Sequence, residues 1–183
     1  LGKDIWATDH YLALDLNKEL AESKYLKGNH EEADKLFELV LSHTEESLRK
    51  AKVYNSQIDL YQSMGRFAEA IEIGVKALQL FGYDLPMANE QEVIGKEIAE
   101  VQEKLKDRDI KTLLDLPLME DPEQKLVMET LLNLYAPIYN ARPQLLPFLT
   151  MKMVNISLTY GNTEASVYAY IYYGVTMGSV FQN

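Results

Sequence analysis

The segment Gly28–Leu41, GNHEEADKLFELVL, has a second copy in the chain at Gly65–Leu78, GRFAEAIEIGVKAL. The two copies are 37 residues apart, and each has a glycine, an alanine five positions later, and apolar residues at helical spacing. A self-similar unit of this length is typical of stacked helical hairpins. We therefore predict an all-α fold, a right-handed superhelix of antiparallel helical hairpins (an α-α solenoid).

The first hairpin is predicted to join a helix over residues 5–27 to a second helix that begins at Asn29. Gly28 suits the junction because helices commonly end on a left-handed residue, a conformation that costs glycine little. Small residues, Ala33 and Ala70, are expected where the two helices of each hairpin approach most closely. We expect the first helix to bury Trp6, Leu12, Leu16, Leu20 and Ala21.

Further helices are predicted after the second copy, at about 91–106, 122–136, 145–160 and 163–180. Asp121 is a good cap for the second of these, with Pro122 at its first position. The last helix carries tyrosines and other apolar residues nearly all round, which predicts neighbours on every side. We assign residues 1–86 to two hairpins and residues 87–183 to divergent hairpins that continue the same solenoid. The start LGKDIWATDH has no methionine, which predicts a piece of a larger chain.

Composition narrows the class of partner. The chain has 183 residues, 47% of them hydrophobic, which is enough for a sizeable core. Its formal net charge of −10 disfavours contact with nucleic-acid phosphates. It has no cysteine and no apolar run long enough to span a bilayer. We predict a cytoplasmic chain with a protein partner, no nucleic acid and no membrane contact.

The sequence motifs predict no catalytic, cofactor or metal site. Phosphate-binding glycine loops and a GxSxG elbow are missing, and the three histidines (His10, His30 and His43) are not at ligand spacing. The run Tyr168–Tyr173 is interpreted as helix packing, and a stacking surface for a ligand is the other interpretation.

The first helices of stacked hairpins line a continuous concave face, and that face is where a partner is expected. The register set by the two glycines predicts which residues it contains: Lys18, Glu22, Tyr25, Asn55, Asp59 and Gln62.

The two copies resemble the tetratricopeptide repeat. Gly28, Ala33, Phe37 and Val40 match its glycine, alanine, aromatic and small-apolar positions. The second copy differs in having Gly74 at the aromatic position, and the spacing of 37 exceeds the usual one of about 34 residues. The resemblance implies a TPR-like stack of helix pairs.

A longer resemblance covers nearly the whole chain and is most specific in LPLMEDP (Leu116–Pro122) and LTYGN (Leu158–Asn162). These phrases are similar to the helical-repeat region of very large signalling proteins. In that family a serine/threonine-kinase-like domain and an AAA-type ATPase module precede the repeats, and GAF sensor and histidine-kinase output domains follow them. The resemblance implies an interaction scaffold between modules, without the kinase or ATPase residues.

Two functions from different classes follow from the sequence. The first is a non-catalytic scaffold that mediates protein–protein or interdomain interaction in signal transduction. The alternative is a small all-helical ligand-binding domain or enzyme with a site between helices. The lack of clustered polar residues favours the scaffold.

Overall fold

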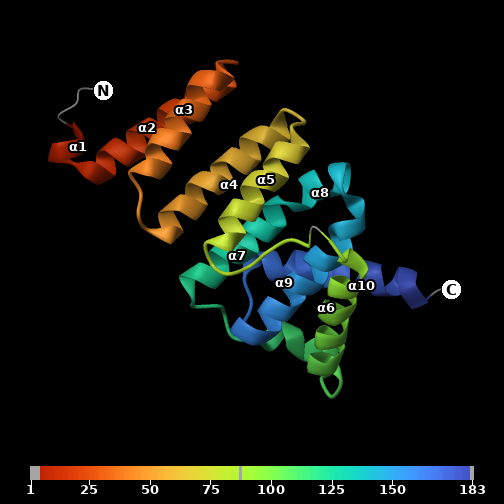
Figure 1. The fold of residues 1–183 in the computed structure, drawn as a ribbon. Helices are drawn as coiled ribbons and strands as arrows, with labels where there is room; N and C mark the ends of the chain where they lie inside the picture. The colour runs from red at the N-terminus through yellow and green to blue at the C-terminus, as the bar shows by residue number, and fades with distance from the viewer. Residues whose placement is uncertain (1–4, 87, 182–183) are drawn as a thin grey trace.

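The computed structural model describes residues 5–86 and 88–181, and this part of the chain is all-α (Figure 1). Its described residues form helices joined by turns, with one isolated β-bridge and no strand. Met87, where the second predicted region begins, lies outside the described residues. The helices are α1 (Ile5–Thr8), α2 (His10–Leu26), α3 (His30–Ser42), α4 (Ser47–Ser63), α5 (Phe67–Gln79), α6 (Glu90–Leu105), α7 (Pro122–Asn133), α8 (Tyr135–Ala141), α9 (Leu146–Tyr160) and α10 (Glu164–Phe181), with 3₁₀ turns at Ile110–Asp115 and Pro143–Leu145.

The two sequence copies form the predicted hairpins. Helix α2 packs against α3 and α4 against α5, and Figure 1 shows the two pairs side by side. Gly28 (φ 81°) and Gly65 (φ 71°) both adopt the left-handed conformation between paired helices, which glycine tolerates best. Ala33 and Ala70 are fully buried, as expected for the points of closest approach.

The first predicted helix differs from the structure in two ways. It is broken at Asp9, whose carboxylate accepts a hydrogen bond from the Leu12 amide (3.0 Å) and so begins α2. The leucine stripe expected to be buried is exposed: Leu12 by 47%, Leu16 and Leu20 by 38% each. Ala21 is buried as expected, but it belongs to the stripe beside the leucines, which also includes Ala13 and Leu14. Successive helical positions are about 100° apart, so burying one stripe turns the next toward solvent.

The second half of the chain does not stack in chain order. Helix α7 packs on α4 and α8 on α5, directly after the second hairpin, whereas α9 pairs with α10. Helix α6 precedes all of these in sequence but packs against α9. The order of hairpins in space therefore departs from their order in the chain at α6.

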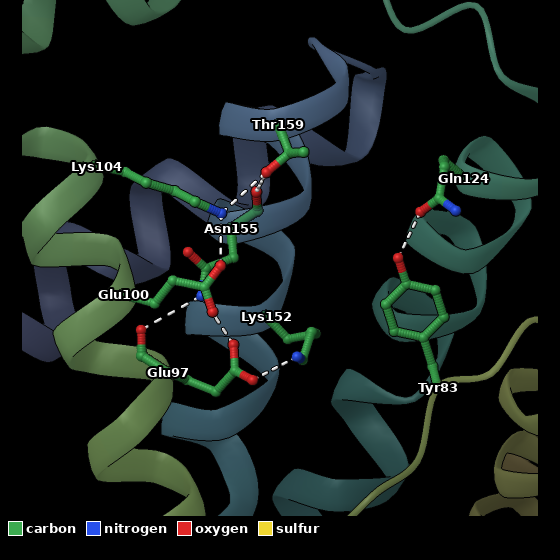
Figure 2. Close-up of polar contacts among 8 residues, drawn as sticks. All are labelled: Tyr83, Glu97, Glu100, Lys104, Gln124, Lys152, Asn155 and Thr159. Atoms are coloured by element: carbon green, nitrogen blue, oxygen red, sulfur yellow. Dashed lines mark hydrogen bonds and ion pairs between the residues drawn. The ribbon is translucent and has the colours of Figure 1, made fainter.

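A polar network holds α6 on α9 (Figure 2). The carboxylate of Glu97, only 9% exposed as a residue, pairs with the Lys152 ammonium and accepts a hydrogen bond from Asn155 Nδ2 (2.8 Å). One turn further along, Lys104 binds Glu100 Oε1 (2.6 Å) and donates to Thr159 Oγ1 (2.9 Å). The Glu97 contacts are charge-assisted and partly shielded from water, which makes them stronger than surface pairs, whereas the Lys104 contacts are exposed.

The two most specific phrases of the sequence, LPLMEDP and LTYGN, lie against each other. The Met119 amide donates to the Asn162 carbonyl, and the Asn162 amide donates to the Pro117 carbonyl, both at 2.8 Å. A side chain at Gly161 would have its Cβ 2.3 Å from the Pro117 carbonyl oxygen, so only glycine fits. Asn162 also donates to the Leu113 carbonyl (2.7 Å) and accepts from the Tyr170 hydroxyl (2.8 Å). Both phrases therefore have a structural role: they tie the segment before α7 to the turn between α9 and α10.

One large core runs from Tyr25 and Ala33 of the first hairpin to α10, and a small cluster around Phe37 joins the first hairpin to Val53 of α4. The last helix is packed on one side only. Ala165 and Ala169 face the core, while Val167, Ile171 and Val175 are exposed, so the described residues do not surround α10 as the sequence predicted. None of the described helices is both long and apolar enough to cross a bilayer.

Candidate partner-binding surface

Four of the six predicted surface residues are accessible on the neighbouring helices α2 and α4. On α2, Lys18 and Glu22 form an ion pair one turn apart (2.6 Å). On α4, Gln62 donates a hydrogen bond to Asp59 Oδ1 (3.1 Å). Each helix thus presents an ordered polar pair, with a carboxylate in both.

Glu22 of α2 lies close enough to Asp59 of α4 to affect the pKa of Asp59. Partial burial raises the pKa of Asp59, the negative charge of Glu22 raises this pKa further, and the hydrogen bond from Gln62 opposes the shift. The two carboxylates therefore add negative charge to the surface between the helices. Lys18 already neutralises part of the charge on the α2 side.

The other two predicted residues are buried. Tyr25 is 1% exposed, its ring packs 5.6 Å from that of Tyr61, and Asn55 is 4% exposed. Neither amide atom of Asn55 has a hydrogen-bond partner among the described residues. Because α4 packs on both α2 and α7, these side chains point into helix contacts. Of the six predicted residues, only Lys18, Glu22, Asp59 and Gln62 are accessible without opening the fold.

Lys18 lines a charged groove between α2 and the start of α4, with a volume of about 550 Å³. Its apolar lining includes Leu14 and Val53, and its charged lining has both signs, for example Asp15 and Arg49. A groove with an apolar floor and charged edges suits a peptide that buries one face and pairs its ends with the rim.

Gln62 lines a second groove, which we call the tyrosine groove, with a volume of about 600 Å³. Its walls come from α7, α8 and α10, and apart from the tyrosines it has no ionisable side chain among its described lining residues. The lining residues are Gln62, Leu132, Asn133, Tyr135, Ala136, Tyr139, Asn140, Tyr168 and Tyr172.

The four tyrosines of this groove come from two helices. Tyr135 and Tyr172 stack with ring centroids 4.0 Å apart and planes within 14°. Tyr139 is 64% exposed and Tyr168 is 49% exposed, one helical turn from the stacked pair on α8 and α10 respectively. Of the run predicted to be packing, Tyr170 and Tyr173 do pack against the core, whereas Tyr168 and Tyr172 line the groove.

The tyrosines that α8 contributes to this groove were not predicted from the sequence. The i, i+4 spacing of Tyr135 and Tyr139 indicates a shared helix face, but nothing in the sequence indicates that this face meets α10. Helix α8 packs on α5 and α10 packs on α7, and both contacts join segments that are far apart in the chain.

The histidines serve the packing of the first hairpin. His10 Nε2 lies 2.9 Å from the His43 carbonyl oxygen, and the His43 ring stacks on Trp6 at 4.2 Å. His30 packs edge-on against Tyr25. The described residues include no group of three or more His, Asp or Glu side chains placed to hold a metal ion.

Comparison of the chain with protein-family profiles, with curated proteins and with solved structures gives no match.

Proposed function

We propose that this chain is a non-catalytic helical-repeat scaffold that binds an extended segment of another protein, or of another domain, along the face formed by α2, α4, α8 and α10. One observation carries the proposal: Lys18 lines the charged groove and Gln62 lines the tyrosine groove. The repeat register predicts both residues on the binding face. Glu22 follows Lys18 by one turn on α2, and Asp59 precedes Gln62 by one turn on α4, so polar side chains continue from each groove along two helices that pack together.

The chemistry of this face suits a polypeptide better than a small substrate. Its lining combines tyrosine rings, side-chain amides and charges of both signs, and aromatic residues of this kind are enriched at protein interfaces.

We further propose that the helix pairs form a TPR-like right-handed solenoid in a cytoplasmic signalling protein of the kind that the sequence resembles. The paired helices, the glycine turns and the buried alanines support this proposal. In that setting the bound segment is part of a kinase, ATPase, sensor or output module.

A displayed library of random peptides, selected on the purified chain, tests the proposed function. Selected peptides are then titrated by fluorescence anisotropy against Lys18→Glu, which reverses the charge at the rim of the charged groove. We expect affinity to fall about tenfold, equivalent to about 1.4 kcal/mol.

The matched control is Lys35→Glu, which breaks an i, i+4 pair of the same type with Glu31 on α3, outside both grooves. Affinity for the control variant should stay within about twofold of the parent. The proposal fails if no peptide is selected, or if both variants weaken binding equally.

A further inference from the structure

We propose that the tyrosine groove binds an uncharged, proline-rich segment in the polyproline II conformation. This inference rests on the proposed function and specifies one half of the binding face. The charged groove around Lys18 is left to the rest of the bound segment.

The charge pattern selects against charged side chains in this groove. Although the whole chain carries a formal net charge of −10, the described lining of the tyrosine groove has no Asp, Glu, Lys, Arg or His. A charged side chain that entered the groove would lose water without gaining a partner of opposite charge. An uncharged segment avoids this cost.

The rings provide flat surfaces in two rows. Tyr135 and Tyr139 are one turn apart on α8, and Tyr168 and Tyr172 are one turn apart on α10. The stacked pair Tyr135–Tyr172 joins the rows and braces them. Burial also raises the pKa of the Tyr135 hydroxyl, which keeps it neutral. Proline-rich segments bind in aromatic-lined grooves, and they lose little conformational entropy because the polyproline II helix is already formed.

The hydrogen-bonding groups fit the same ligand. A polyproline II segment has no internal hydrogen bonds, so its carbonyl oxygens accept bonds from outside, while its prolines have no N–H to satisfy. The groove offers the exposed hydroxyls of Tyr139 and Tyr168, neither bonded to another described residue, and the amide of Asn133. These groups can donate to carbonyl oxygens along the segment.

Two other modes of peptide binding fit less well. All the walls of the groove are helical, so there is no sheet edge at which a strand could be added. An amphipathic helix needs a hydrophobic groove, whereas the aliphatic lining here is confined to Leu132 and Ala136. The observations therefore favour the proline-rich segment over a strand or a helix.

Titration of the whole chain with a fluorescein-labelled proline decamer tests the inference. We expect the proline decamer to bind and a labelled Gly-Ser decamer to bind at least about tenfold more weakly. Tyr139→Ala and Tyr168→Ala should each weaken binding about tenfold, and Tyr139→Phe, which keeps the ring and loses the hydroxyl, about threefold. Tyr11→Ala is the control, because Tyr11 is also an exposed tyrosine (51%) but lies on α2, outside this groove.

The inference is overturned if the proline decamer fails to bind at millimolar concentration, if the Gly-Ser decamer binds equally well, or if the Tyr139 and Tyr168 variants bind like the parent. Circular dichroism of each variant establishes that it is folded. If the library selection yields proline-free peptides that respond to Lys18→Glu, the proposed function holds and this inference fails. An uncharged helical peptide that competes at the tyrosine groove would also refute it.

Discussion

We expect the packing of α6 on α9 to depend on the buried ion pair of Glu97 and Lys152. The variant Lys152→Met tests how much this pair contributes to the free energy of unfolding. Removing one partner of a buried ion pair costs about 3–5 kcal/mol, since it leaves the other charge without compensation. The cost here should be lower because the lysine side chain is 23% exposed and that of Glu97 is 11% exposed, so water screens the remaining charge in part. Asn155 also keeps its 2.8 Å hydrogen bond to the carboxylate. We expect Lys152→Met to lower the free energy of unfolding by about 2–3 kcal/mol.

The double variant Glu97→Met, Lys152→Met should recover at least about 1.5 kcal/mol of this loss, because a buried pair replaced by apolar residues of similar size leaves no charge behind. Asn155 Nδ2 would still have the Glu97 backbone carbonyl oxygen at 3.3 Å. Urea unfolding followed by circular dichroism gives the free energies from the midpoints at constant slope.

The control for this series is Lys96→Met, also a lysine that pairs with a glutamate of α6 (Glu92, 2.6 Å), but with both side chains more than 60% exposed. Its cost should be below about 0.5 kcal/mol. The reasoning is refuted if Lys152→Met costs no more than Lys96→Met, or if the double variant is less stable than Lys152→Met alone.

Two further predictions concern the space beside Gly74 and the charge of Asp59. Gly74→Ala should lower the free energy of unfolding by about 1–3 kcal/mol, because the new Cβ would lie 2.4 Å from Leu134 Cδ2. Gly95→Ala should raise the free energy of unfolding by about 0.5–1 kcal/mol, because its Cβ meets open space on α6. Equal urea midpoints for the two variants would contradict this prediction. Asp59→Asn should stabilise the fold at pH 7 and not at pH 3. The fold raises the pKa of Asp59 above its ordinary value of 3.8. The protonated side chain therefore contributes to stability below pH 3.8, and this contribution is lost as the pH rises through the raised pKa. An equal gain at both pH values in urea unfolding would argue against it.

Local signals in the sequence were enough to predict most of the helices. Gly28 and Gly65 were expected to end helices and do so with positive φ, and the Asp121 carboxylate caps α7 by accepting from the Glu123 amide (2.8 Å). Such features depend on residues within a few positions of one another. For this reason they can be read without knowing the rest of the fold.

The choice between two adjacent stripes of one helix could not be predicted in the same way. The leucines Leu12, Leu16 and Leu20 are more hydrophobic than the stripe of α2 that is buried. Close packing against α3 selects the small residues Ala13 and Ala21 instead, because backbones approach more closely where side chains are short. The identity of the neighbouring helix, and not hydrophobicity alone, decides which face is buried.

The sequence by itself determined that this protein is built of helical hairpins and where most helices begin and end. Only the tertiary structure decided that α6 lies on α9, that Leu134 fills the space beside Gly74, and that tyrosines of α8 and α10 share a groove. The physical reason is the range of the interactions. Caps, turns and helical periodicity act over a few residues, whereas ion pairs such as Glu97–Lys152 and stacks such as Tyr135–Tyr172 join residues far apart in the chain, and they form only when the whole core has packed.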